Sequence, residues 1–480
     1  MGNSNVTFGV IIGTRGFFNP SLAADDREKL LGVLDRLGHR VVILNKDATP
    51  TGAVETRKDA QVCAKLFAEH REEIDGIIVS LPNFGDEIGI AESIRLSGCR
   101  VPVLVQAAND DPDKVDVASR RDSFCGKLSV CNNLYQYGIP FTDTALHTCD
   151  VDGEAFIADI DRFARICSVV RGLSTARIGL IGTRPAAFQT VRFSEKLLQA
   201  SGITIVPIDL SVMLDRAEKM LKQSELLKKK IKEFRAYGTI PEAISDEQVG
   251  KQAAFTLAVD EWVEEEELDA TAIQCWDTVE KLFGCATCLT MSLMGERGKP
   301  SACEADIAGA VSMLALRLAS GEAPGLLDWN NNYADDPDKC VSTHCSNYPR
   351  SFMGNDIEIS ELDILGGTIG KSICFGAIKG RVASGDMTFF RISTDDTQGY
   401  IKGYVGAGEF TDDPFPMDGG IAVCKVDRLQ FLMKTLCANG FEHHVAMVRG
   451  KWDDVVREAV STYLGWEVYH HNSEPEVPML

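Results

Sequence analysis

The chain has 480 residues, which is more than one ordinary hydrophobic core organises, so two to four domains are expected. Its formal charge of −21, from 70 acidic and 49 basic residues, repels phosphate backbones and makes nucleic acid a poor partner. No segment approaches the roughly 18 consecutive apolar residues of a membrane helix, and the amino terminus lacks the pattern of a signal peptide. We therefore expect no membrane partner and a cytoplasmic location.

Fifteen cysteines are scattered along the chain without the rhythm of a secreted disulfide scaffold. An odd number cannot all pair, so we expect reduced and mostly buried thiols. Cys285 and Cys288 have CxxC spacing, but no second pair follows at zinc-ribbon distance. A redox or zinc role for this pair is therefore the less favoured interpretation.

Short apolar runs alternate with amphipathic helical patterns through residues 1–172, which predicts an N-terminal α/β domain. The runs cover residues 8–12, 41–44, 76–80 and 101–106. This alternation is typical of a parallel sheet covered by helices on both faces, in which ligands bind beyond the carboxyl ends of the strands. Arg15, Asn83 and Phe84 are expected at that edge. Arg15 suits a surface turn equally well, and the turn at 13–16 lacks the GxGxxG pattern of dinucleotide binding.

A second α/β domain is predicted over residues 173–355, starting with the apolar run 176–182. A strand expected at 270–276 carries Gln274 and Trp276 at its end. These two side chains suit either a half-buried strand end or the binding of a sugar ring, since an indole beside an amide commonly holds sugars.

Two carboxylates of this second domain fall at predicted segment ends. The pattern at 302–320 predicts a helix with Glu304 in its first turn, where a carboxylate also stabilises the helix start. Asp328 follows the apolar run 325–327, as it would at the end of a buried strand or in a turn.

Residues 356–480 are rich in glycine and in β-forming runs, which predicts a mostly antiparallel, barrel-like or sandwich domain. If residues 442–448 form a strand, His443 and His444 face opposite sides, so that only one of them reaches a pocket. The histidines at 470–471 are expected in a mobile end.

Carboxylates and imidazoles therefore gather at the ends of predicted segments. Glu304, Asp328 and His344, with a histidine from 443–444, suit Mn²⁺, Mg²⁺ or a similar ion with open positions for substrate. Such an ion polarises a sugar carbonyl, and two flanking carboxylates can move a proton between adjacent carbons through an enediol. The spacing of these residues does not establish this chemistry, because they are scattered and form no HExxH-type motif.

Seven short motifs, in this order, resemble those of the L-fucose/L-arabinose isomerase superfamily, and in particular those of fucose-isomerase-like proteins. They are GTRGFF at 13–18, GTRPAAF at 182–188, IQCW at 273–276, CEAD at 303–306, LDW at 327–329, HCSN at 344–347 and EHHVA at 442–446. The resemblance implies two Rossmann-like parallel-sheet domains followed by a β-rich, barrel-like C-terminal domain. It also implies an aldose–ketose isomerase that uses Mn²⁺, with Mg²⁺ or Co²⁺ as alternatives, and a homo-hexamer with sites near subunit interfaces.

Carried over to these positions, the resemblance makes Glu304 and Asp328 both metal ligands and the acid/base pair, with His444 as the remaining ligand. It leaves open whether His443 takes that place, and whether His344 binds metal or only faces substrate. The further sugar contacts that it implies are Arg15, Asn83 and Phe84, from a neighbouring subunit, and Gln274, Trp276, His344, Asn347 and His443.

The resemblance does not fix the substrate, because the family acts on L-fucose, L-arabinose and sulfonated hexoses such as sulfoquinovose. Arg15, Arg184 and Arg192 could bind an anionic sugar, since guanidinium groups pair well with oxyanions, or could be ordinary structural arginines. The chain is shorter than bacterial fucose isomerases, so some pocket-closing loops are expected to be missing. A non-catalytic cytosolic sugar-binding protein of the same fold is the alternative function.

Overall fold

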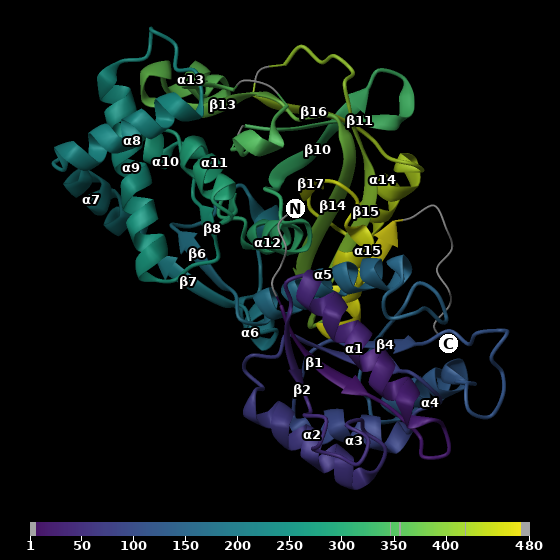
Figure 1. Ribbon diagram of the computed structural model, residues 1–480. Helices are drawn as coiled ribbons and strands as arrows, with labels where there is room; N and C mark the ends of the chain where they lie inside the picture. The colour runs from purple at the N-terminus through teal and green to yellow at the C-terminus, as the bar shows by residue number, and fades with distance from the viewer. Residues whose placement is uncertain (1–5, 346, 355–356, 418, 472–480) are drawn as a thin grey trace. The chain divides into compact units, whose positions relative to one another are not determined.

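The computed structural model describes residues 6–345, 347–354, 357–417 and 419–471, which form two compact units (Figure 1). Unit 1 contains residues 6–171 and 458–465, and unit 2 contains residues 172–457 and 466–471. Within these ranges, no helix has the length and apolar character needed to cross a membrane.

Unit 1 is built on a parallel sheet with the strand order β2-β1-β3-β4-β5. Its strands are β1 (Thr7–Ile12), β2 (Arg40–Ile43), β3 (Gly76–Leu81), β4 (Val103–Ala107) and β5 (Thr142–Asp143). Its helices are α1 (Pro20–Arg36), α2 (Arg57–Glu69), α3 (Glu87–Ser97), α4 (Ser123–Gln136) and most of α5 (Glu154–Ser174).

Each face of this sheet has its own apolar core, because successive side chains of a strand point to opposite faces. Ile11 packs with apolar side chains of α2, α3 and α4, whereas Phe8 and Val10 pack with those of α1 and α5. The doubly covered parallel sheet predicted from the alternating pattern is confirmed.

Unit 2 contains a second parallel sheet, with the strand order β7-β6-β8-β9. Its strands are β6 (Arg177–Ile181), β7 (Thr204–Ile208), β8 (Ala270–Ile273) and β9 (Ser301–Ala302). The helices of this part are α6 (Glu195–Ala200), α7 (Leu210–Met220), α8 (Ser224–Tyr237), α9 (Asp246–Glu265), α10 (Thr278–Leu282), α11 (Cys288–Glu296) and α12 (Ile307–Ser320).

The rest of unit 2 is a largely antiparallel sheet whose strands β16-β11-β10-β17-β14-β15 close into a six-stranded barrel through pairing of β15 with β16. Its strands are β10 (Gly325–Tyr333), β11 (Asp336–His344), β14 (Gly385–Asp395), β15 (Tyr400–Thr411), β16 (Gly420–Lys425) and β17 (His444–Arg449). Strands β12 (Glu358–Glu361), β13 (Phe375–Arg381) and β18 (Glu467–His471) extend the sheet at its edges, and α13 (Asp363–Ile369), α14 (Leu429–Ala438) and α15 (Asp453–Glu458) follow its strands in the chain.

The β-rich C-terminal region is thus confirmed, with two differences in detail. Strands β10 and β11 pair within the barrel although they precede residue 356, so the barrel draws strands from both sides of that position. The expectation of a mobile end at 470–471 is wrong, because both histidines lie in β18, which pairs with β15.

Helix α12 connects the two sheets of unit 2. Its residues from Ile307 to Leu316 are buried, and it packs against β8 and β9 on one side and β14 and β17 on the other (Figure 1). An apolar surface all round is what a helix enclosed by other elements requires. The turn before α12 and the adjoining ends of the barrel strands carry the candidate site.

Candidate active site

Glu304 lies in a strained turn and not in a helix, so its expected place in the first helical turn is wrong. Helix α12 begins at Ile307, and Glu304 and Ala305 have left-handed φ angles of 59° and 57°. Such angles cost non-glycine residues roughly 1 kcal/mol or more each and persist where the surroundings enforce them. Here the N–H of Ala305 donates to Ile273 O at 3.1 Å, which ties the turn to β8. The turn buries the Glu304 side chain, which is only 3% exposed.

Asp328 and His444 are brought together by strand register. They are directly paired residues of β10 and β17, and Asp328 also pairs with Thr343 of β11. Asp328 lies inside β10, which continues to Tyr333, and not at a strand end or in a turn as expected. Side chains opposite each other on antiparallel strands lie within contact distance, so the register places this carboxylate beside this imidazole.

The carboxylate and imidazole groups converge on His444 Nε2. This atom lies 2.8 Å from Glu304 Oε2 and 3.6 Å from Asp328 Oδ1. His344 Nε2 lies 4.0 Å from the same Glu304 oxygen, and His443 Nε2 lies 3.9 Å from the same Asp328 oxygen. The structure therefore gathers all five residues, as two overlapping groups that share His444.

The expectation that His443 and His444 face opposite sides is wrong. Strand β17 begins at His444, so the alternation of a strand does not extend back to His443. The two rings have centroids 4.6 Å apart, and both line the same cavity.

A buried ion pair holds the far side of the His444 ring. Asp306, the N-cap of α12, lies 2.8 Å from His444 Nδ1 and accepts a hydrogen bond from Arg391 Nη2 at 3.1 Å. Arg391 of β14 is fully buried and has Glu442 as a second carboxylate at 3.5 Å. Burial would raise the pKa of Asp306, but the Arg391 guanidinium and the His444 ring together lower it well below its ordinary value. A carboxylate at Nδ1 leaves Nε2 directed at Glu304 and Asp328.

The protonation of His444 follows from these neighbours. Burial lowers its pKa, but hydrogen bonding to Asp306 and Glu304 raises it, to about 9. Arg391 already balances Asp306, so the protonated ring is a positive charge for Glu304 and Asp328 on the other side.

The buried oxygen atoms test whether a divalent cation fits this site. Within the described part of the chain, Asp328 Oδ1 is buried and accepts no hydrogen bond, and the buried Glu304 Oε2 has only imidazole nitrogens beside it, His444 Nε2 at 2.8 Å and His344 Nε2 at 4.0 Å. Buried carboxylate oxygens without partners are rare, and an ion that binds oxygen and imidazole ligands would satisfy both. The hydrogen bond of Asp306 to the other ring nitrogen is the usual support of a metal-bound histidine. Glu304, Asp328 and His444 therefore fit such an ion.

The site forms the floor of a cavity of about 470 Å³ within unit 2. Sites for small molecules fall in the range of roughly 300–1,000 Å³, so a sugar fits. Among the described residues that line the cavity, acidic side chains outnumber basic ones. The one lysine among them, Lys379, forms an ion pair with Asp363. The acidic lining residues are Glu280, Glu304, Asp328, Glu361 and Asp363.

Glu280 is an unexpected member of the cavity wall. It is 1% exposed, and neither of its carboxylate oxygens has a hydrogen-bond partner within the described residues. Burial raises its pKa to about 7, with a smaller contribution from the nearby Cys345 thiol. This side chain is a carboxylic acid that can be protonated near neutral pH.

The other sugar contacts expected in unit 2 divide into two classes. Trp276 lines the cavity, is 42% exposed and packs edge-on against Phe188, with ring centroids 4.8 Å apart. Gln274 and Asn347 are absent from the described lining. The side-chain oxygen of Gln274 accepts a hydrogen bond from Thr183 N–H at 2.9 Å, and the side-chain NH₂ of Asn347 donates one to Ser301 O at 3.3 Å.

The three residues expected to act from the N-terminal domain lie together in unit 1. The Arg15 guanidinium lies 4.3 Å from the Phe84 ring centroid and pairs with Glu87. Asn83 is fully buried and donates to Thr14 Oγ1 at 2.9 Å. The Asn83 amide therefore shapes the turn, whereas Arg15 and Phe84 form a cation–π pair at its surface.

The two arginines of unit 2 that were considered for an anionic sugar make local contacts. Arg184 donates to Pro185 O at 3.2 Å, and Arg192 donates to Gln189 O at 3.0 Å. Neither belongs to the described lining of the cavity.

Sequence reasoning missed the residues behind the site. Asp306 and Glu442 lie inside two of the motifs, two residues away from Glu304 and His444 respectively, so proximity to the candidate ligands was a usable signal. No comparable signal marks Arg391 or Glu280, because a strand arginine and a helical glutamate are ordinary surface residues in most sequences.

The fold and the site define an enzyme that performs acid–base chemistry on a small polar molecule, since carboxylates and imidazoles face one cavity. Comparison with protein families matches residues 9–174 to the fucose/sulfoquinovose isomerase N-terminal domain and residues 342–471 to the L-fucose isomerase C-terminal domain.

Relatives are found as well. A sulfoquinovose isomerase from Priestia aryabhattai is 29% identical over 73% of this chain and 75% of its own. One from Alkalicoccus urumqiensis is 29% identical over 61% of this chain and 65% of its own, and one from Clostridium sp. (strain MSTE9) is 25% identical over 40% and 43%. The chain belongs to the fucose isomerase-like superfamily and is a sugar isomerase, which removes the non-catalytic sugar-binding alternative.

Proposed function

We propose that this sugar isomerase depends on Mn²⁺, with Mg²⁺ or Co²⁺ as substitutes, and interconverts an aldose and its 2-ketose through an enediol. The observation that supports the proposal most is the convergence of the buried carboxylate oxygens Glu304 Oε2 and Asp328 Oδ1 on His444 Nε2, with Asp328 Oδ1 accepting no hydrogen bond from a described residue. These three residues would hold the ion. When bound, the ion would polarise the sugar carbonyl and its neighbouring hydroxyl.

The protein's own side chains then transfer the protons and position the sugar. One carboxylate of the Glu304–Asp328 pair removes the proton from C2 of the open-chain aldose, and the other protonates O1, which gives the enediol. Removal of the proton from O2 and delivery of a proton to C1 give the ketose, so no proton or electron is gained or lost. Trp276 and Phe188 supply an aromatic wall for the sugar, and Asp306 keeps the His444 ring in place.

For the substrate we propose a sulfonated hexose of the sulfoquinovose type, because the relatives carry that activity in their names. A neutral aldose such as L-fucose or L-arabinose is the second candidate. It is favoured by the cavity lining, in which the one described lysine is already paired with a carboxylate.

The decisive experiment is a panel of neutral and sulfonated aldoses incubated with the Mn²⁺-loaded protein, with the ketose detected by NMR. We expect conversion of at least one sugar, loss of conversion on chelation and recovery when Mn²⁺ is returned. Glu304→Gln should lower turnover by about 10²–10⁴-fold, the usual contribution of a general acid or base. The matched control is Glu361→Gln, a second carboxylate of the same cavity, which should keep most of the turnover. Full turnover in chelated protein or in Glu304→Gln would contradict the proposal.

We also propose a homo-oligomer, hexameric by resemblance, in which Arg15 and Phe84 of one subunit complete the cavity of the next, while the buried Asn83 amide holds the turn that carries them. Subunit mixing tests this arrangement. If Arg15→Ala and Glu304→Gln each lower turnover, dissociated and reassembled mixtures of the two should recover part of it, because some sites then receive both native residues. Turnover no higher than the average of the two parents would contradict the shared site.

A further inference from the structure

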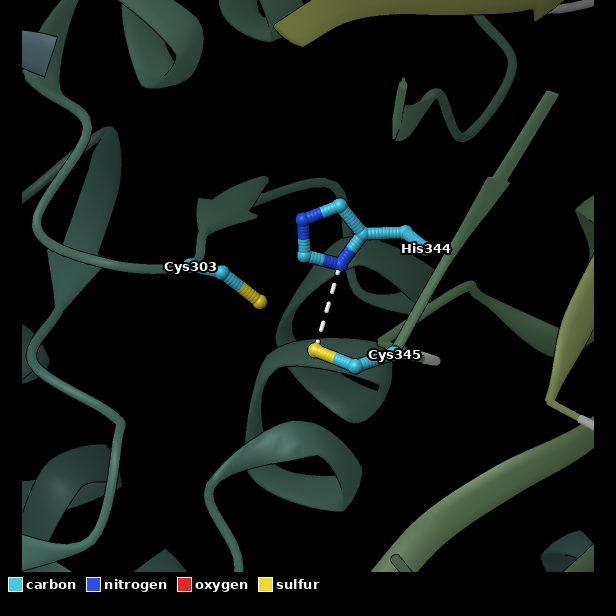
Figure 2. A group of neighbouring side chains, drawn as sticks. All are labelled: Cys303, His344 and Cys345. Carbon is cyan, nitrogen blue, oxygen red and sulfur yellow. Dashed lines mark hydrogen bonds between the residues drawn. The ribbon is translucent and has the colours of Figure 1, made fainter. Parts of the chain in front are cut away.

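A second cluster of metal-binding side chains adjoins the candidate active site in unit 2. The ligand atoms of Cys303, His344 and Cys345 all lie within 4.8 Å of one another, and His344 Nδ1 lies 3.3 Å from Cys345 Sγ. Figure 2 shows the two sulfur atoms and the imidazole ring pointing toward one another. Cys303 comes from the turn after β9, whereas His344 ends β11 and Cys345 follows it.

The chemistry of these ligands differs from that of the neighbouring oxygen-rich site. Thiolate sulfur and imidazole nitrogen select Zn²⁺ and similar thiophilic ions, whereas carboxylates suit Mn²⁺ and Mg²⁺. Around a tetrahedral zinc ion with sulfur at 2.3 Å and nitrogen near 2.0 Å, neighbouring ligand atoms lie roughly 3.5 Å apart. The cluster approaches that spacing and needs only small side-chain shifts to reach it.

The immediate surroundings offer a fourth ligand. The Cys288 thiol donates a weak hydrogen bond to the backbone oxygen of Cys345, with the sulfur 4.0 Å from that oxygen. Cys275, Cys288 and Cys345 also line the 470 Å³ cavity. The remaining position of a tetrahedral ion can therefore be filled by the Cys288 thiol or by water from the cavity.

Burial alone would not single out these thiols, since free cysteine is among the most buried residue types. These thiols differ from the others because two sulfur atoms and a ring nitrogen, from segments about 40 residues apart in sequence, lie within 4.8 Å of one another. The His344 ring directs Nδ1 to the sulfurs and Nε2 toward Glu304, at 4.0 Å. The ring is therefore available to the sulfur cluster while Glu304, Asp328 and His444 remain as the oxygen-rich set.

We propose that Cys303, His344 and Cys345 bind a thiophilic divalent cation, with Zn²⁺ as the natural ion, at a site distinct from the proposed Mn²⁺ site and adjoining it through the His344 ring. Binding forms two sulfur–metal bonds and one nitrogen–metal bond, and the two thiol protons leave to solvent. The site does not depend on the reaction proposed above.

Cobalt substitution tests the site, because thiolate-bound Co²⁺ has a charge-transfer absorption in the near ultraviolet that oxygen-bound Co²⁺ lacks. Reduced full-length protein in excess Mg²⁺, without oxygen, is titrated with Co²⁺. We expect the absorption to saturate at one equivalent of thiolate-bound ion per chain and to disappear when Zn²⁺ is added. Co²⁺ in the oxygen-rich site contributes nothing to this band.

Four variants locate the source of the cobalt absorption. Cys303→Ala and Cys345→Ala should each lose at least half of the band, whereas Cys374→Ala, which removes another fully buried thiol, should keep it. Glu304→Gln should also keep the band while losing turnover, so that failure of the proposed reaction and failure of the sulfur site are distinguishable.

A measurement on the unmodified protein covers the case in which a cysteine variant fails to fold. Cadmium NMR of the Cd²⁺ complex reports the number of sulfur ligands from the chemical shift, and we expect a resonance of a site with two or three sulfurs. Absence of both that resonance and the cobalt band would overturn the proposal, as would a band that survives both Cys303→Ala and Cys345→Ala.

Discussion

The His444 ring is held from both sides by carboxylates, and the pair behind it has no access to solvent. Asp306 and Arg391 are both 0% exposed, and their ion pair joins α12 to β14. A buried ion pair adds little net stability over apolar packing, but removing one partner leaves the other charge buried and uncompensated. The pair therefore serves to position His444, and its loss should lower both the stability of the protein and its affinity for the metal ion.

A double-mutant cycle measures this coupling. Asp306→Asn and Arg391→Met should each lower the free energy of unfolding by about 3–5 kcal/mol, because each leaves a buried charge without its partner. The double variant should lose clearly less than the sum, which denaturant titration will detect. Additive losses would mean that the pair is not coupled. In Asp306→Asn, Mn²⁺ affinity should fall about 10–100-fold, the usual effect of removing the partner of a metal-binding histidine.

Glu280 should make stability depend on pH. Its pKa is about 7 in the folded protein against an ordinary value of 4.5, so the folded state binds more protons than the unfolded state between these pH values. The stability that the protonated acid contributes is complete below pH 4.5 and is lost as pH rises through about 7. Glu280→Gln should therefore gain stability relative to the native protein as pH rises, by at most about 3 kcal/mol at pH 8.

Denaturant unfolding at pH 5 and pH 8 checks this prediction. Glu218→Gln, on an exposed position of α7, is the matched control. A Glu280→Gln difference that does not grow between the two pH values would show that the carboxyl is not the buried acid described above.

At the scale of elements, α12 fixes the site because its N-terminus meets the strand ends. Gly309 in its first turn lets Asp306 and Arg391 approach, since a Cβ at this position would lie 2.5 Å from Asp306 Oδ2 and 3.1 Å from Arg391 Nη1. The Asp306 side chain cannot withdraw freely, because it also bonds to His444 and caps the helix through Gly309 N–H.

Gly309→Ala should therefore be harmful although alanine is the better helix former by about 1 kcal/mol. We expect a lower melting temperature and a Mn²⁺ affinity reduced several-fold, measured by thermal unfolding and by titration. Gly250→Ala in α9 is the matched control, because a Cβ there meets no atom within 4 Å. It should raise stability by up to about 1 kcal/mol and leave metal affinity unchanged. The prediction fails if the two variants behave alike.

At the scale of the whole molecule, the net charge of −21 and the buried carboxylates of the candidate site favour stabilisation by cations. A ligand that binds only the folded state stabilises it by about 2.7 kcal/mol at a hundred times its Kd. Mn²⁺ at that level should therefore raise the melting temperature of the native protein. Asp328→Asn should lose most of this rise, whereas Asp363→Asn, a cavity carboxylate already paired with Lys371 and Lys379, should keep it. An equal rise in both variants would place the stabilising ion elsewhere.

The sequence by itself determined the fold class, because the period of apolar residues distinguishes a covered parallel sheet from an antiparallel barrel. It also singled out Glu304, Asp328, His344 and the histidine pair, because these metal-capable groups lie at segment ends and inside motifs that resemble those of the isomerase superfamily. It misjudged the local setting of three of them: Glu304 lies in a left-handed turn, Asp328 lies inside a strand, and His443 precedes the strand that contains His444. These errors have one cause, because element boundaries depend on packing that a local pattern does not contain.

Only the tertiary structure decided which groups meet. The register of β10 on β17 pairs Asp328 with His444, although 116 positions separate them in the chain. The same packing buried Arg391 against Asp306, left the Glu280 carboxylate without a hydrogen-bond partner among the residues that the structure describes, and brought Cys303 to Cys345. These side-chain contacts are set by the packing of elements that are far apart in the chain. The free energy of each contact depends on how deeply it is buried, which no single stretch of sequence encodes.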